Sequence, residues 1–132
     1  MDQPAAMKYP AQLFGKITWI PPDGSIVSVS DVKAILRSRD EIAFDCRDDS
    51  DPTWPMSYTV TLNRTTEDSF KGSFKCTRQG IPPGEVKCRW YSSSTGCALI
   101  GTWVEEKKTF RWFAELFYPS NDGSLGQSSG KE

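Results

Sequence analysis

The amino-acid sequence predicts an all-β protein, a single-domain antiparallel up-and-down barrel of about seven or eight strands. Apolar and polar residues alternate with a period of two along most of the chain, as they do in half-buried strands. Proline and glycine clusters separate these runs, and the connections are short enough for neighbouring strands to pair antiparallel. Closure into a barrel removes exposed sheet edges, so we favour it over a two-sheet sandwich.

Alternating runs define most of the predicted strands. The clear runs cover residues 13–19, 42–46, 58–63, 70–77, 86–91, 97–103 and 109–117. Turn formers lie between them, and Glu105 to Lys108 has the composition of a hairpin turn with mixed charge. We expect residues 1–12 to form an N-terminal arm, residues 13–118 the β-barrel domain, and residues 119–132 a flexible C-terminal tail.

One further element has two interpretations. Val27 and Val29 share one face of an alternating run, but the alternation breaks at Ser30 and Asp31. A bulged strand explains the break. A short helix near residues 30–37 also explains it, because Ser30 is a suitable N-cap and Val32, Ile35 and Leu36 fit a helical face. We favour the bulged strand, with the helix as the alternative.

Composition and motifs exclude several classes of function. The chain has 132 residues, 16 Lys+Arg against 17 Asp+Glu, and no histidine. It therefore lacks the basic surplus of a nucleic-acid binder and the histidine of Ser-His-Asp, Cys-His and His-zinc sites. No apolar run approaches the roughly 20 residues that a membrane helix needs. The acidic run with Asp45, Asp48, Asp49 and Asp51 lacks the glycine and terminal Glu of a calcium loop.

Enzyme chemistry has little support in the sequence. It contains no phosphate loop, nucleophile elbow or metal-ligand cluster, so we expect no cofactor and no metal. A barrel enzyme with converging carboxylates is the least favoured of three hypotheses. The N-terminus has no basic stretch followed by an apolar core, so we expect a cytoplasmic protein with reduced cysteines. Cys76, Cys88 and Cys97 fall on the apolar parity of their strands and should be buried.

Large aromatic rings dominate the predicted interior, which leads to the first hypothesis. The predicted inward rings are Trp19, Phe70, Phe74, Trp90, Trp103, Phe110 and Trp112. Three glycines share their parity, Gly15, Gly72 and Gly101, and they either make room for neighbouring indoles or leave a cavity lined by tryptophans. We expect a non-enzymatic barrel that binds a small apolar or aromatic ligand in this Trp-lined interior. The candidate ligand-binding residues are Trp19, Tyr58, Trp90, Trp103 and Trp112.

The outer face of the last two strands leads to the second hypothesis. Ile100, Val104, Phe113 and Phe117 point away from the predicted interior. Apolar residues on both faces indicate that the outer face is covered, by residues 1–12, by segment 30–37 or by a partner. The alternative function is therefore a protein-binding module, either an immunity- or inhibitor-type protein or a homodimer, that uses these four residues.

Two short motifs resemble those of a known structural group. Gly101-Thr102-Trp103 within a strand, Phe70-x-Gly72-x-Phe74 and the meander of hairpins resemble calycin-type barrels, the group of lipocalins, fatty-acid-binding proteins and avidins. Avidin-like chains have a similar strand motif and a Trp-rich interior. In lipocalins and avidins the Gly-x-Trp motif lies in the first strand, whereas here it lies in the penultimate one. The resemblance therefore implies the barrel architecture over residues 13–118 and no particular binding residue.

Overall fold

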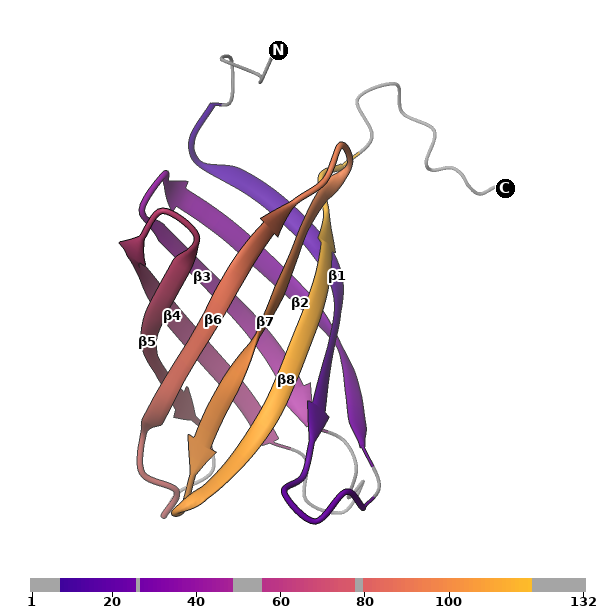
Figure 1. The fold of residues 1–132 in the computed structure, drawn as a ribbon, viewed down its shortest axis with the longest axis vertical. Coiled ribbons are helices and arrows are strands. Elements are labelled where there is room, and N and C mark those ends of the chain that lie inside the picture. Colours follow the sequence, from indigo (N-terminus) through magenta and orange to yellow (C-terminus); the bar gives the residue numbers. More distant parts are fainter. Residues whose placement is uncertain (1–7, 26, 49–55, 78–79, 120–132) are drawn as a thin grey trace, which may run out of the picture.

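The protein forms a closed barrel of eight antiparallel strands in sequential order (Figure 1). The computed structural model describes residues 8–25, 27–48, 56–77 and 80–119. The strands are β1 (Ala11–Ile20), β2 (Ser28–Ser38), β3 (Glu41–Asp48), β4 (Met56–Thr66), β5 (Ser69–Cys76), β6 (Gly84–Ser92), β7 (Gly96–Glu105) and β8 (Lys108–Phe117). Pairing of β1 with β8 closes the barrel. The predicted up-and-down barrel is confirmed.

The barrel has two distinct ends. The short turns β2–β3, β4–β5 and β6–β7 lie at the end that is uppermost in Figure 1, and we call it the upper end. The connections β1–β2, β3–β4, β5–β6 and β7–β8 lie at the lower end. β1 begins at Ala11, two residues before the expected start of the barrel, because Ala11 and Gln12 already pair with Leu36 and Ile35.

The segment with two interpretations is a strand. β2 runs without a break from Ser28 to Ser38, so the helix near residues 30–37 was the wrong alternative. Its pairing with β1 keeps one register from Ser28 to Leu36, and the irregularity lies later, between Leu36 and Ser38 against β3. The alternation seemed to break because Val27 and Val29 are exposed on the outside, while Val32 and Leu36 are buried inside.

The inward-facing glycines allow close packing of neighbouring strands. A Cβ atom at Gly15 would lie 1.7 Å from the backbone oxygen of Glu115, and one at Gly101 would lie 1.8 Å from that of Lys87. Gly72 meets the backbone oxygen of Thr61 in the same way. At each of these three positions a side chain would collide with the backbone of an adjacent strand, so only glycine fits there.

The core consists of the inward side chains of all eight strands. Trp103, Trp112, Phe70 and Phe74 are its largest fully buried members. No polar or charged residue is buried among the described residues. In the same part of the chain, no helix is long and apolar enough to cross a lipid bilayer.

Candidate functional site

Trp103 of β7 lies at the centre of a cluster of rings in the lower half of the barrel. Its ring stacks on Phe74 with centroids 4.7 Å apart. It meets Tyr58 at 5.3 Å and Trp19 at 5.6 Å edge to face. Trp112 approaches it from above at 6.3 Å. These contacts bring together four of the five predicted ligand-binding residues.

A small cavity opens beside this cluster at the lower end. Its volume is about 170 Å³. Its walls come from the ends of β1, β2, β4, β7 and β8, and it is lined by Trp19, Pro21, Ser28, Met56, Tyr58, Trp103, Glu105 and Phe110. Most of these side chains are apolar or aromatic, which is the usual character of a site for a small molecule.

Glu105 supplies a negative charge to the cavity. The Tyr58 hydroxyl donates to its carboxylate, with oxygen distances of 3.1 and 3.3 Å. The Trp103 indole Nε1–H donates to Oε1 at 3.1 Å. These two donors hold the carboxylate in position beside the rings.

The sequence predicts Glu105 within the hairpin turn and not within the site. The signal was present, because Glu105 lies two residues after Trp103 and therefore has the same inward parity. The turn itself was predicted correctly. Glu106 and Lys107 occupy it with φ angles of 51° and 69° and join Glu105 to Lys108.

Trp19 brings an unsatisfied polar group to the same region. Its side chain is only 6% exposed. Its indole Nε1 is buried and has no hydrogen-bond partner among the described residues. A buried donor without an acceptor costs about 1–3 kcal/mol. Such groups are uncommon in well-packed cores, and this one belongs to a residue that lines the cavity.

The other two predicted tryptophans do not line the cavity. Trp112 is fully buried, and its indole N–H donates to the backbone oxygen of Thr102 at 3.0 Å, so it is a core residue. Trp90 lies near the upper end, where its ring is 5.7 Å from Phe70 and its N–H donates to Ser92 Oγ at 2.8 Å. The alternation placed both rings inside but could not place them along the barrel axis.

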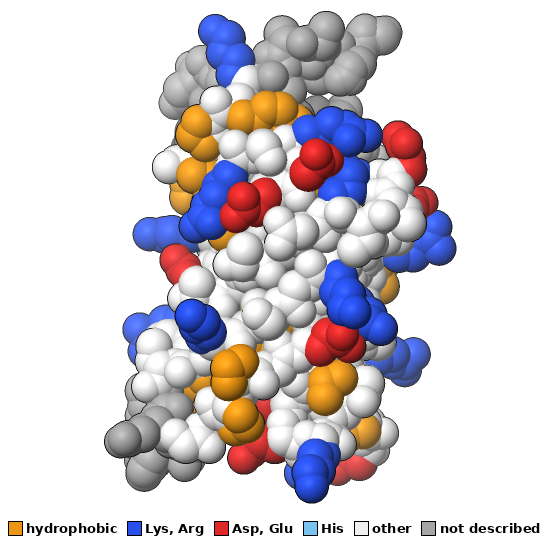
Figure 2. Space-filling model, turned by 90° about the vertical axis from the view of Figure 1, so that its left-hand side faces the viewer, with side chains coloured by type: hydrophobic (Ala, Val, Ile, Leu, Met, Phe, Trp, Pro, Cys, Tyr) orange, Lys and Arg blue, Asp and Glu red, His pale blue; other side chains and the backbone are white. Residues whose placement is uncertain are grey.

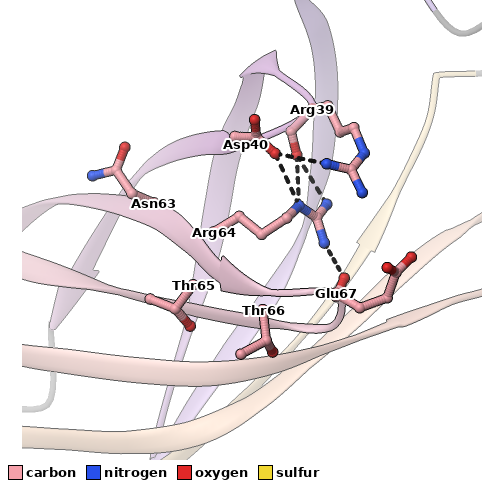
Figure 3. Close-up of a pocket in the computed structure, with 7 residues that line it drawn as sticks. All are labelled: Arg39, Asp40, Asn63, Arg64, Thr65, Thr66 and Glu67. Carbon is pink, nitrogen blue, oxygen red and sulfur yellow. Dashed lines mark hydrogen bonds and ion pairs between the residues drawn. The ribbon is translucent and has the colours of Figure 1, made fainter.

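Arg64 of β4 lies at the upper end of the barrel, where it bonds to residues of two turns (Figure 3). Its Nη2 donates to the backbone oxygen of Arg39 at 2.9 Å, and its Nη1 donates to that of Glu67. The guanidinium also lies 4.6 Å from the centre of the Phe70 ring. Arg64 thus ties the β2–β3 turn to the β4–β5 turn. The polar depression of about 400 Å³ around it is lined by Arg39, Asp40, Arg64 and Glu67, which are joined by the bonds of Arg64 and Arg39, and by Asn63, Thr65 and Thr66.

None of the four cysteines forms a disulfide, and Cys88 and Cys97 are buried as expected, whereas Cys76 is only partly buried. Burial raises the pKa of Cys88 to about 12, and the nearby Cys97 contributes to that shift. Burial alone raises the pKa of Cys97 to about 12. Both are therefore protonated and unreactive at neutral pH. Among the described residues, no group of His, Cys, Asp and Glu could hold a metal ion, and Asp49 and Asp51 lie outside them.

The predicted partner-binding residues lie on the outer wall. Ile100, Phe113 and Phe117 are 53%, 41% and 48% exposed, whereas Val104 is only partly exposed. Phe14 of β1 joins them, because it pairs with Phe117 while Ile100 pairs with Phe113. We call Phe14, Ile100, Phe113 and Phe117 the outer apolar patch. Segment 30–37 belongs to β2, so it forms wall and does not cover this patch.

The side of the barrel that carries β4 and β5 in Figure 1 has a different surface. Figure 2 shows basic and acidic side chains interspersed over it. Glu85 pairs with Lys71 at 3.2 Å and with Lys87 at 3.6 Å, and Arg89 pairs with Asp68 at 2.8 Å. Mixed, paired charges of this kind are typical of a solvated wall.

Comparisons with known proteins identify a fold and no family. No protein-family model and no curated protein matches the sequence. Among solved structures, the chain is similar to a redesigned β-barrel, with a TM-score of 0.61 and 13% identity over 84% of this chain and 91% of that one. At that identity the similarity shows the closed β-barrel fold alone.

Proposed function

We propose that the protein is a small, non-enzymatic barrel of the calycin type that binds a small aromatic or apolar ligand in the lower cavity. The observation that carries the proposal is the cavity of about 170 Å³ between Trp19, Tyr58, Trp103 and Phe110. An apolar cavity of about 150 Å³ is large enough to bind benzene. Pockets for larger, drug-sized ligands hold about 300–1,000 Å³, so the expected ligand has one ring.

Titration with a panel of one-ring compounds, neutral and charged, tests this proposal. Ser28 lines the cavity at the start of β2, while Val29 beside it points outward. We expect at least one compound to bind saturably, Ser28→Leu to weaken that binding tenfold or more by filling the cavity, and Val29→Leu to leave it unchanged. A panel without a saturable binder, or equal binding by both variants, would contradict the proposal.

We propose self-association through the outer apolar patch as the second candidate function. The patch has three aromatic rings about half exposed on adjacent strands, and such patches commonly mark interfaces. Arg111 and Glu115 flank Phe113 on β8, two residues to either side and on the same outward parity. A two-fold axis at Phe113 would place Arg111 of each copy opposite Glu115 of the other, so the surface is complementary to itself.

Charge reversal tests this dimer directly. Arg111→Glu should shift the protein toward monomer in analytical ultracentrifugation, because it places two acidic residues opposite each other. The double variant Arg111→Glu, Glu115→Arg should restore the dimer. A wild-type monomer at high concentration would contradict self-association. Capture of a different, stoichiometric partner through Phe113 and Phe117 would favour the inhibitor-type alternative.

A further inference from the structure

We infer that the ligand of the lower cavity is a small ring that carries a carbonyl oxygen, and that this oxygen accepts a hydrogen bond from Trp19 Nε1. The inference rests on the ligand-binding function proposed above. Trp19 lines the cavity, and its buried Nε1 has no hydrogen-bond partner among the described residues. A bound molecule that brings an acceptor to this donor removes the cost of leaving it unsatisfied.

The other tryptophans in the described part of the chain show that this donor is exceptional. The indole N–H groups of Trp90, Trp103 and Trp112 donate to oxygen atoms at 2.8, 3.1 and 3.0 Å. Trp19 instead has the rings of Tyr58 and Trp103 as neighbours, at 5.9 and 5.6 Å. An aromatic ring accepts an N–H only weakly, so these neighbours do not replace an oxygen acceptor.

A hydroxyl group lies on the same inner wall beside Trp19. Ser28 of β2 is directly opposite Trp19 of β1 in the register of the two strands, and both residues line the cavity. The Cβ atoms of such a pair are about 4.5–5.5 Å apart. The half-buried Ser28 hydroxyl has no hydrogen bond to the described part of the chain. A carbonyl oxygen has two lone pairs, so it can accept from both groups.

The space beside these two donors suits the body of a one-ring ligand. The cavity holds about 170 Å³ and is walled by the rings of Tyr58, Trp103 and Phe110. Because the cavity lies beside the indole, a small tilt of Trp19 brings its N–H to the oxygen of a bound molecule. A hydrocarbon ring of the same shape would fill the same space and would leave the Trp19 donor unsatisfied.

A shape-matched pair of neutral compounds tests this inference: acetophenone, and α-methylstyrene, in which a CH₂ group replaces the carbonyl oxygen. Binding is followed from the indole N–H signals in NMR titrations. We expect acetophenone to move the proton signal of Trp19 Nε1 downfield, as a new hydrogen bond does, and α-methylstyrene not to do so. Both compounds carry the same phenyl ring, so its ring-current effect is shared, and the difference between the two shifts reports the hydrogen bond.

Substitutions test the two donors through the ratio of the affinities for acetophenone and α-methylstyrene. Trp19→Phe keeps a ring and removes the N–H, and it should lower this ratio about fivefold. Ser28→Ala is a smaller change that spares the ring cluster, and it should lower the ratio about threefold. Ser38→Ala is the matched control, because Ser38 is exposed at the upper end of the same strand, and it should leave the ratio unchanged.

The outcomes distinguish this inference from the proposed function. Equal shifts of the Trp19 proton with both compounds, or a ratio unchanged in both Trp19→Phe and Ser28→Ala, would overturn the carbonyl assignment and leave a barrel for hydrocarbon rings. A ratio lowered as much by Ser38→Ala as by Ser28→Ala would also overturn it. Absence of saturable binding by acetophenone, while a hydrocarbon ring binds, would overturn the carbonyl assignment alone. Absence of any one-ring binder would overturn both proposals together.

Discussion

The two ends of the barrel each hold one charged side chain against aromatic rings, but they use it differently. At the upper end Arg64 lies over Phe70 and donates to the backbone oxygens of Arg39 and Glu67. At the lower end Glu105 accepts from Tyr58 and Trp103 beside a cavity. The guanidinium joins two turns of the chain, and the carboxylate faces space that a ligand can fill. This difference agrees with our proposal that the lower end binds a ligand, whereas the bonds of Arg64 at the upper end stabilise the barrel.

The largest effect is expected from Trp103→Ala. Trp103 is 1% exposed and contacts four other rings, so its removal leaves a large hole in the core. We expect a loss of about 3–5 kcal/mol in the free energy of unfolding, measured by urea denaturation. Trp90→Ala, which removes a half-buried ring near the upper end, should cost less. Equal losses would show that the ring cluster is not the centre of the core.

Arg64→Met separates stability from binding. The variant retains a long apolar side chain but loses the bonds to Arg39 and Glu67, which leaves two backbone oxygens without this donor. We expect the free energy of unfolding to fall by about 2 kcal/mol. Binding of a one-ring ligand at the lower end should be unchanged in the same NMR titration. A loss of ligand affinity that exceeds the loss of stability would contradict the division of roles between the two ends.

Alkaline pH should destabilise the upper half of the barrel, where Cys88 and Cys97 lie. Each thiol has its pKa raised from 9.0 to about 12 in the folded protein. The folded state therefore holds these protons more tightly, so the stabilisation is complete below pH 9 and is lost as the pH rises from 9 toward 12. We expect a loss of about 1 kcal/mol per thiol for each pH unit in that window.

Serine substitution supplies the control for the alkaline effect. The pH dependence between 9 and 11, followed by chemical denaturation, should become shallower in Cys88→Ser and Cys97→Ser. If the free energy of unfolding depends on pH equally steeply in both variants and in the wild type, groups other than these thiols cause the loss of stability. Alkylation by iodoacetamide at pH 8 should be slow at both thiols in the folded protein, because almost none of either is ionised.

Tyr58→Phe should have a smaller effect on stability than on binding. It removes the hydroxyl that donates to Glu105 and keeps the ring that packs on Trp103 and Phe74. We expect a stability loss of about 1 kcal/mol and a several-fold loss in affinity for a one-ring ligand of the lower cavity. Thr59→Val on the outer face of the same strand is the control and should leave the affinity unchanged. Full affinity in Tyr58→Phe would show that the carboxylate does not need this anchor.

The smallest effect is expected from the β7–β8 turn. Lys107 has a φ of 69°, a left-handed conformation that costs an ordinary residue about 1 kcal/mol. Lys107→Gly should therefore raise the free energy of unfolding by up to that amount. The gain is reduced because glycine has more conformational entropy than lysine in the unfolded chain, which favours unfolding. A large loss of stability would mean that the lysine side chain has a structural role at the lower end.

The sequence predicted which side of the wall most residues face, because side chains alternate with a period of two in a strand. That rule places Trp19, Trp103 and Phe74 inside and Phe113 and Phe117 outside, as the structure has them. The same rule places the Glu105 side chain inside. The residues around Glu105 have the composition of a turn, so Glu105 was not predicted to belong to the site. Alternation carries no information on height along the barrel axis. It therefore could not separate Trp90 at the upper end from Trp103 at the lower end.

Long-range contacts account for the rest of what sequence analysis missed. Arg64 donates to the backbone oxygen of Arg39, 25 residues away in the chain, and Gly15 and Gly101 lie against backbone atoms of adjacent strands. Such partners depend on the stagger of the strands in the closed barrel, which is a property of the whole sheet. The type of residue at one position does not indicate how the strands are staggered.

The most direct test of the proposed ligand binding at the lower end uses the tryptophans as reporters. The chain has five tryptophans, and their indole N–H signals can be assigned by substitution in ¹⁵N-labelled protein. On titration with the tightest-binding one-ring compound, we predict saturable shifts of the Trp19 and Trp103 signals, with the Trp90 signal unmoved. Shifts centred on Trp90, or a titration that moves none of these signals, would contradict the account.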